Sequence, residues 1–377
     1  MRRRILALAL MGLFTIEARA QTSAHVGLAT RVFHPTQTRN WRGAEHKELR
    51  CTIWYPAIST AIETKQTIGP PDAPLFEAGS AVPDAQFEPA LRKFPLVLLS
   101  HGSGGSAEQM AWLGTALARA GYIAIAVDHP GNNSREPYTA EGFVLWWERA
   151  TDLSEVLDGV LADAEIGPHI DPERVGSAGF SIGGYTAMEL AGAQTDVSIL
   201  YDLCRERTDS SQKPDKGAKD ADTAACHIPE MRNMGSPHQM LQAVRKTSGE
   251  SLARSGDSFQ DPRVKAVFAI APAMGMTFTD DSLRAIRLPV EMVVGNADPI
   301  APARDNDDWI RMNVRGARET ILPGGVMHYT FLDTCTPEGK TRLGTYCADN
   351  ASVSRDAVHA KVADMAVKFF DKSLKSH

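Results

Sequence analysis

Continuous apolar runs alternate along this chain with segments of helical periodicity, and this alternation limits the possible folds more than any other feature. A run that is apolar at every position indicates a strand covered on both faces. The runs are Phe94–Leu99, Tyr122–Val127, Val175–Phe180, Val264–Ala271 and Val290–Gly295. Between them, apolar residues recur at helical spacing at Met110, Leu113 and Leu117, and again at Leu153, Val156, Leu157, Val160 and Leu161. This order predicts an α/β protein with a mostly parallel, doubly wound sheet.

The segment before Phe94 shows no such alternation of strands and helices. Leu28–Phe33 and Leu49–Trp54 are rich in β-forming residues, so we expect two further strands there. The connection Pro56–Pro89 is rich in proline and weakly patterned, and it predicts no regular element.

One polar segment, from about 195 to 261, interrupts the alternation at a point where a lid could be inserted. Its part 208–222 is almost wholly charged or small, which favours an exposed excursion without regular structure. Ile199–Leu203 and Met240–Val244 are apolar enough to pack as short helices. We therefore expect a single domain, 21–377, with a lid-like insertion.

The first twenty residues have the features of a secretory signal peptide. Three arginines, Arg2 to Arg4, precede the apolar stretch Ile5–Phe14, and Ala18-Arg19-Ala20 gives the small-residue pattern that signal peptidases recognise. The apolar stretch is too short to span a bilayer. The sequence thus predicts cleavage near Ala20 and a secreted or periplasmic protein without stable membrane insertion.

The charge balance limits the partners of such a protein. Removing residues 1–20 takes away four arginines and one glutamate, which leaves 36 basic and 45 acidic residues and a net charge of −9. A net negative charge disfavours binding to nucleic acid or to an anionic membrane surface. The expected partner is a small molecule, and the sequence leaves the oligomeric state open.

The candidate nucleophile is Ser181, in Gly179-Phe180-Ser181-Ile182-Gly183. The motif follows an expected strand and precedes an expected helix, Ile182–Ala193. A serine on such a sharp strand-to-helix turn is held out of the sheet, and glycines two residues away on either side avoid steric clashes. The helix N-terminus favours the negative charge that forms on attack.

A glycine-rich turn, His101-Gly102-Ser103-Gly104-Gly105, directly follows the strand Phe94–Leu99. Tetrahedral intermediates need fixed backbone N–H donors for the developing oxyanion. We expect the amides of Ser103 and Ile182 to form this oxyanion hole. His101 is the less favoured candidate for the base, because the base comes last in the chain order Ser, Asp, His, and it is interpreted as stabilising the turn.

The candidate acid and base follow later strands. Asp298 lies in the turn after Val290–Gly295, at the carboxyl edge of the sheet where active-site groups of open α/β sheets gather. Its rivals Asp305, Asp307 and Asp308 fall in an expected helix, where they would form a solvated face. His328 lies in the loop after the short strand Glu319–Ile321, so it can reach Ser181 while Asp298 orients its ring.

Five large side chains lie just beyond strand ends or beside Ser181, and they are candidates for the wall of a substrate pocket. The alternative is plain core packing. They are Trp112, His129, Tyr185, Met274 and Met276.

The five cysteines suggest disulfides in an exported protein. Two pairs bracket polar stretches, Cys204 with Cys226 and Cys335 with Cys347, while Cys51 would be a buried thiol. Spacing alone does not determine the pairing. A bond between Cys335 and Cys347 would close a short ring directly after His328, and we expect its loss to lower kcat before the domain unfolds.

The stretches SHGSGG, AVDHPG, SAGFSIGGYTA, VGNADPIAP and PGGVMHYTFLD resemble the secreted bacterial branch of dienelactone hydrolase-like and platelet-activating-factor-acetylhydrolase-like enzymes, over most of 25–375. The resemblance implies the α/β-hydrolase fold and a Ser-His-Asp esterase without metal or organic cofactor, with Ser181, Asp298, His328 and the donors Ser103 and Ile182 at the family's motif positions. True dienelactone hydrolases use a cysteine nucleophile, where this chain has Ser181.

These observations predict a secreted serine hydrolase that cleaves carboxylic esters through an acyl-enzyme intermediate. Two alternatives remain: an amidase or peptidase with the same three residues, and a non-catalytic binding protein on the same fold. The acyl chain and the alcohol of the substrate are left open.

Overall fold

A computed structural model describes residues 25–89, 93–200, 234–235 and 237–375 of the 377-residue chain. The expected signal peptide, the excursion 208–222 and the cysteines Cys204 and Cys226 lie outside the described residues.

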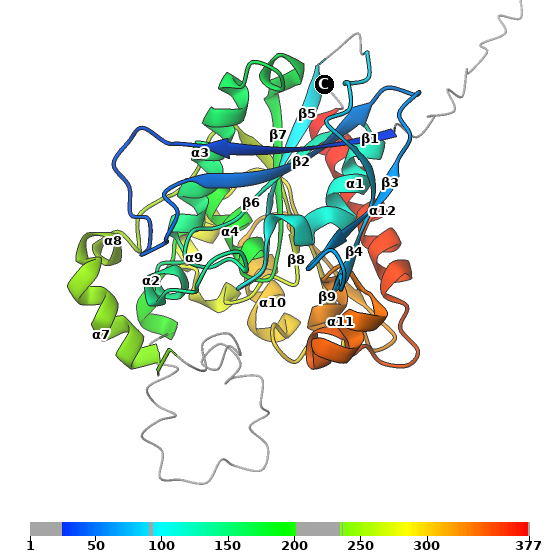
Figure 1. The fold of residues 1–377 in the computed structure, drawn as a ribbon. Coiled ribbons are helices and arrows are strands. Elements are labelled where there is room, and N and C mark those ends of the chain that lie inside the picture. Colours follow the sequence, from blue (N-terminus) through cyan, green and yellow to red (C-terminus); the bar gives the residue numbers. More distant parts are fainter. Residues whose placement is uncertain (1–24, 90–92, 201–233, 236, 376–377) are drawn as a thin grey trace, which may run out of the picture.

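The chain is built around an eleven-stranded sheet in the order β10-β9-β8-β7-β5-β6-β2-β1-β4-β11, with β3 paired to β4 (Figure 1). The strands are β1 (His25–Phe33), β2 (Leu49–Ala57), β3 (Thr64–Ile68), β4 (Phe76–Pro83), β5 (Phe94–Ser100), β6 (Ile123–Val127), β7 (Ile170–Phe180), β8 (Val264–Ile270), β9 (Val290–Gly295), β10 (Arg318–Leu322) and β11 (Thr334–Cys335).

The strands expected from continuous apolar runs are β5 to β9, and together with β10, which contains the expected short strand Glu319–Ile321, they form the parallel part of the sheet. All residues of β5 and β6 are buried, as expected for strands covered on both faces. At the other end, β2 pairs antiparallel with β6 and with β1. The predicted mostly parallel, doubly wound sheet is confirmed.

Helices cover both faces of this sheet (Figure 1). Helices α3 and α4 pack on one face, and α1 and α12 pack on the other. The described helices are α1 (Ala111–Arg119), α2 (Ala140–Val144), α3 (Glu148–Ala162), α4 (Ile182–Leu190), α7 (Pro237–Thr247), α8 (Gly249–Ala253), α9 (Asp280–Ala285), α10 (Asp307–Asn313), α11 (Pro337–Arg342) and α12 (Arg355–Leu374).

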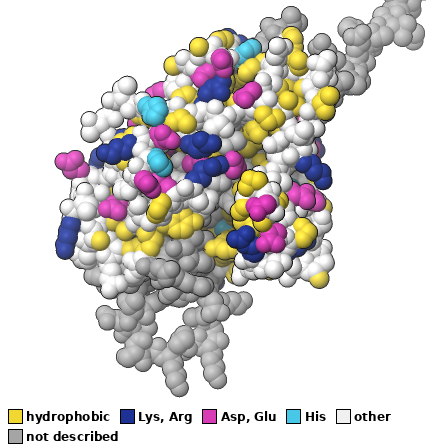
Figure 2. Space-filling model, viewed as in Figure 1, with side chains coloured by type: hydrophobic (Ala, Val, Ile, Leu, Met, Phe, Trp, Pro, Cys, Tyr) yellow, Lys and Arg dark blue, Asp and Glu magenta, His cyan; other side chains and the backbone are white. Residues whose placement is uncertain are grey.

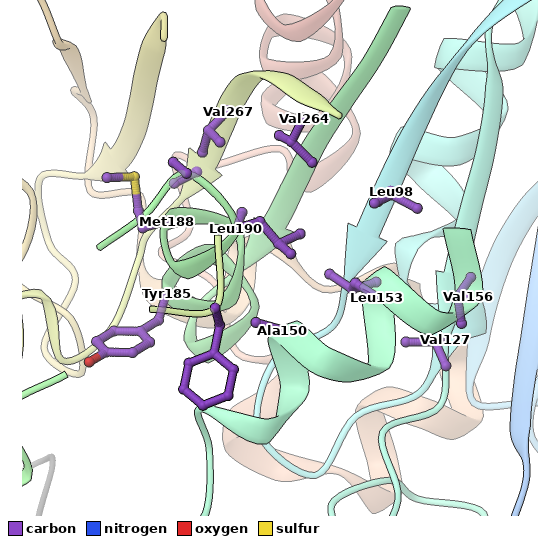
Figure 3. Packing of buried hydrophobic residues seen from close by; sticks show 14 of the residues in the cluster. Leu98, Val127, Ala150, Leu153, Val156, Tyr185, Met188, Leu190, Val264 and Val267 are labelled. Atoms are coloured by element: carbon purple, nitrogen blue, oxygen red, sulfur yellow. The ribbon is translucent and has the colours of Figure 1, made fainter. Parts of the chain in front are cut away.

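The predicted stripe of α3 forms the core on its side of the sheet. Leu153 and Val156 belong to one buried cluster with Leu98 of β5 and Val127 of β6 (Figure 3). Burying a side chain of this size contributes about 1.5–3 kcal/mol to folding. The stripe therefore fixes which face of α3 meets the sheet.

The hairpin β3–β4 lies within Pro56–Pro89, where the sequence predicts no regular element, so that prediction is wrong there. The residues of β3 are exposed or half-buried, which explains why the segment lacks an apolar pattern. Strand β11 pairs with β4, so the hairpin holds the chain a few residues after His328.

The described part of segment 195–261 lies beside α2 and α3. Helix α7 contains the expected helix Met240–Val244 and packs against α2. In α8, Ser251 accepts a hydrogen bond from the Trp147 indole through its backbone carbonyl and donates one to Glu148 through its hydroxyl. Residues 197–200 are helical at the start of the other expected helix, whose remainder lies outside the described residues. A lid role for the segment stays a prediction.

Basic and acidic side chains are interspersed on the face seen in Figure 2. Among the helices of the described residues, none is long and apolar enough to cross a bilayer.

Candidate active site

Ser181 lies on the sharp turn between β7 and α4, with φ 57° and ψ −124°. A residue other than glycine in such a conformation costs on the order of 1–3 kcal/mol, which the surrounding structure must offset. The amide of Ser181 donates to the carbonyl of Ile270 at 2.9 Å, and its carbonyl accepts from the amides of Gly184 and Ala273. This turn, which we call the elbow, is thus held by the end of β8, by the loop that follows it and by the first turn of α4.

The glycines of the motif are required by close backbone approaches. A Cβ on Gly179 would lie 2.2 Å from the carbonyl oxygen of Gly183, and a Cβ on Gly183 would lie 2.0 Å from that of Ser100. Both distances are far below van der Waals contact. Glycine at these two positions lets the elbow close and lets α4 start directly against the end of β5.

The structure brings the three residues singled out in the sequence together. His328 begins the 3-10 turn η6 (His328–Phe331), and its Nε2 lies 2.9 Å from Ser181 Oγ. Its Nδ1 lies 2.7 Å from Asp298 Oδ2. Only 7% of Ser181 and 2% of His328 are exposed to solvent. With the proton on Nδ1 donated to Asp298, Nε2 can accept the proton of Ser181, as a general base must.

Asp298 is fixed by its own loop. Its Oδ1 accepts hydrogen bonds from the amides of Ile300 and Ala301, at 2.9 and 2.8 Å, so that Oδ2 faces His328. Burial would raise the pKa of Asp298, but the His328 ring and these amides outweigh burial and hold the pKa below its usual value. The carboxylate is therefore ionised at neutral pH.

The rival carboxylates do not contact His328. Asp305 and Asp308 pair with Arg304 and Arg311. Asp307 differs from the predicted solvated face, because it is fully buried and neither carboxylate oxygen has a hydrogen-bond partner among the described residues. Burial first, and then the nearby Glu319 and Asp298, raise its pKa well above the usual range. Asp307 is therefore a buried core residue whose surroundings favour the neutral form.

The segments that carry the two expected oxyanion donors lie against each other. A Cβ on Gly102 would lie 3.5 Å from the Cβ of Ser181, and Gly183 abuts the end of β5. Ile182 is the first residue of α4, so its amide is at the helix N-terminus. In the described part of the chain, the amide of Ser103 donates to no protein group.

The expected pocket residues separate into two groups. Met274 and Met276 lie in the loop after β8, next to Ala273, which donates to the Ser181 carbonyl; Met276 is half-buried. Their role in a pocket stays a prediction.

The other three residues are buried, and their side chains contact the protein interior. Tyr185 is fully buried, and its hydroxyl binds Thr195 and Thr277. The indole of Trp112, in α1, donates to the Phe331 carbonyl and its ring stacks on His359, so it packs against η6 and α12. His129 is fully buried in a polar network. These contacts favour the alternative of core packing for all three residues.

That polar network is the part of the site region that the sequence analysis missed. His129 Nδ1 lies 2.7 Å from Asp152 Oδ2, and His129 Nε2 lies 2.9 Å from Ser100 Oγ. Arg149, one helical turn before Leu153, donates to Ser100 Oγ at 3.2 Å. A charged residue on the apolar stripe of α3 was the available signal for this network.

Cys335 and Cys347 form a disulfide bond, as expected, and Cys51 is a buried free thiol. Arg355 also holds both ends of this segment, because it donates to the carbonyl of Asp333, just before Cys335, and to that of Tyr346, just before Cys347. The disulfide is therefore one of several restraints on the segment after His328.

Two family models match the chain. The model of the alpha/beta hydrolase family matches residues 96–336, which is more than half of the chain and contains every residue of the candidate site. The chain belongs to the alpha/beta hydrolase family. The model of platelet-activating factor acetylhydrolase, isoform II, matches residues 29–142, in line with the resemblance read from the motifs.

Parts of the sequence are similar to a lipase and to a cutinase. Lipase 1 of Moraxella sp. (strain TA144) is 33% identical over 92 residues, which cover 24% of this chain and 26% of the lipase. Cutinase est1 of Thermobifida alba is 30% identical over 109 residues, which cover 28% of this chain and 33% of the cutinase. The matches thus span only a quarter to a third of these relatives.

Among solved structures, a ferulic acid esterase from Streptomyces cinnamoneus superposes with a TM-score of 0.60 at 20% identity, over 94% of this chain and 92% of the esterase. This likeness supports the fold, and it extends beyond the region matched by the family models.

Proposed function

We propose that the protein is a serine hydrolase that cleaves carboxylic esters through an acyl-enzyme intermediate on Ser181. The observation that carries the proposal is the hydrogen-bonded chain from Ser181 Oγ through His328 to Asp298, at 2.9 and 2.7 Å. The strained conformation of Ser181 supports it further, because strain in an otherwise well-packed fold gathers at functional sites.

In the first half of the reaction, His328 Nε2 takes the proton of Ser181 as Oγ attacks the ester carbonyl. The amides of Ser103 and Ile182 receive the oxyanion of the tetrahedral intermediate. The protonated ring, stabilised by Asp298, then gives its proton to the leaving alcohol, and Ser181 is left acylated.

In the second half, a water molecule enters where the alcohol left. His328 takes a proton from this water as its oxygen attacks the acyl carbonyl, and the same amides bind the second oxyanion. The carboxylic acid leaves and the proton returns to Ser181. Apart from the ester and this water molecule, every group used in these steps belongs to the chain.

The substrate is a small-molecule ester. Met274 and the half-buried Met276 follow Ala273, whose amide donates to the Ser181 carbonyl, and thioether side chains suit an apolar acyl or aryl group. The names of the relatives, which are a lipase, a cutinase and a ferulic acid esterase, favour an ester over an amide. We also propose that the protein acts outside the cytoplasm, after cleavage near Ala20, since its disulfide suits an oxidising compartment.

A panel of p-nitrophenyl esters with acyl chains of two to twelve carbons, run beside the matching p-nitroanilides on the protein lacking residues 1–20, tests the function. We expect turnover of at least one ester class and, for the same acyl group, far slower release from the anilide. Faster anilide cleavage would favour the amidase. Binding without turnover of any ester would favour the non-catalytic alternative.

The disulfide gives a prediction for the proposed base. We expect Cys335→Ser with Cys347→Ser to lower the free energy of unfolding by about 3 kcal/mol, since the open ring gains entropy in the unfolded chain. Because Arg355 and the β11–β4 pairing still hold the loop, kcat should fall only several-fold, well short of the ~100-fold expected for a base displaced by about 1 Å.

Chemical denaturation and steady-state kinetics on the double variant measure both effects, and Cys51→Ser serves as the control for loss of a thiol. An unchanged kcat would make the disulfide purely structural. Free thiols at both positions in protein purified from an oxidising compartment would show that the Cys335–Cys347 disulfide does not form.

A further inference from the structure

The chain contains a second Ser-His-Asp arrangement, formed by Ser100, His129 and Asp152 at 2.9 and 2.7 Å. It cannot act as a nucleophile, because all three residues are fully buried. Ser100 is the last residue of β5, directly before the turn that carries the Ser103 amide. The arrangement is therefore placed to hold that turn rather than to react.

Two buried side chains connect this arrangement to the turn. Arg149 donates to Ser100 Oγ, to the carbonyl of His101 and to Asn132 Oδ1. The same Asn132 oxygen accepts the amide of Gly104 at 2.9 Å. One arginine and one asparagine thus bind the backbone on both sides of Ser103.

The rest of the turn is engaged as well. The imidazole Nδ1 of His101 donates to the Gly102 carbonyl at 2.6 Å, and the hydroxyl of Tyr138 donates to the Gly104 carbonyl. The Gly105 carbonyl accepts from the amide of Ser134. Unlike the backbone groups of the neighbouring residues, the amide of Ser103 donates to no group of the described chain, so it is available to an oxyanion.

Ion pairs of the buried Asp152 hold the other end of this network. Asp152 also pairs with Arg42 and Arg39, and it accepts from His129. Burial, and then the nearby Arg149, lower the pKa of His129 to about 3, so its ring is neutral and donates to Asp152 while accepting from Ser100. The hydroxyl of Ser100 therefore presents a lone pair to Arg149, which fixes the direction of the guanidinium.

We propose that Arg149 and Asn132 are positioning residues that preorganise the oxyanion hole by holding the turn His101–Gly104 from the side of α3. The proposal rests on the proposed esterase function. Donors fixed before the reaction stabilise the transition state more than the bound substrate, so their displacement affects kcat rather than KM.

The test compares Asn132→Leu, which removes the accepting oxygen, with Asn132→Asp, which retains it. We expect Asn132→Leu to lower kcat about 10- to 100-fold, with KM within about threefold of wild type. The Ki of an alkylboronic acid, whose tetrahedral adduct on Ser181 places an oxygen in the hole, should rise by the same factor as kcat falls. Asn132→Asp should restore most of both.

Val160→Ala, which destabilises the core of α3 more than two turns away from Arg149, is the control for stability and should keep kcat within about twofold. If Asn132→Leu does not fold, Arg149→Lys decides, since it keeps the charge but replaces the two guanidinium nitrogens, which bind Asn132 and His101 separately, by a single nitrogen. Unchanged kcat and boronic acid Ki in a folded variant would overturn the proposal. An inactive wild type would instead refute the esterase function.

Discussion

Replacing Ser181 by alanine is expected to lower kcat by about 10⁶-fold, to the residual rate that binding and the oxyanion hole provide. His328→Ala should cost nearly as much, because Oγ is a poor nucleophile without a base at 2.9 Å. The double variant should be no slower than either single variant, since the two residues act as one unit. Steady-state kinetics with the best ester of the panel measures all three.

The fold should survive both changes. Ser181→Ala relieves no packing defect and removes only the Oγ contact to His328, so the thermal unfolding temperature should change little. A Ser181→Ala protein that keeps more than about a tenth of the wild-type kcat would contradict the assignment, because loss of a triad nucleophile permits no such rate.

Asp298→Asn is expected to lower kcat by about 10³–10⁴-fold through the wrong tautomer of His328. In the structure, Oδ1 accepts two backbone amides. The oxygen of asparagine should keep that position, which turns its NH₂ group toward His328 Nδ1. The ring must then accept at Nδ1 and carry its proton on Nε2, where it can no longer take the proton of Ser181.

Asp308→Asn is the matched control, since this carboxylate pairs with Arg311 on the surface of α10 and should keep wild-type kcat. The pH profile separates the two explanations of a slow Asp298→Asn enzyme: a wrong tautomer is relieved when rising pH supplies hydroxide as a base, whereas a misfolded site is not. Should Asp305→Asn or Asp308→Asn be the damaging change, Asp298 would be misassigned.

The parallel sheet was predictable because its strands are apolar on both faces, and β9 coincides with the predicted run Val290–Gly295. The approach of Ser181, Asp298 and His328 was predictable for a related reason: each follows a strand, and the carboxyl ends of parallel strands meet at one edge. Local patterns and the order of elements suffice for such features.

Features that depend on contacts between distant segments were not predictable. The indole of Trp112 binds a carbonyl 219 residues away, so its place beyond a strand end says nothing about its partner. His129 also follows a strand, yet the segment around Arg42 covers it, because the Arg42 side chain reaches the Pro130 carbonyl and Asp152. The hairpin β3–β4 is exposed and carries no apolar alternation.

Mass-spectrometric mapping of a fluorophosphonate adduct tests whether Ser181 is the nucleophile. Trypsin separates Ser181, in peptide 175–205, from Ser100 and Ser103, in peptide 94–119. We expect a single adduct, assigned to Ser181 by fragmentation and absent from Ser181→Ala. An adduct on another residue, or none on a protein that hydrolyses the ester panel, would contradict the role of Ser181 as nucleophile.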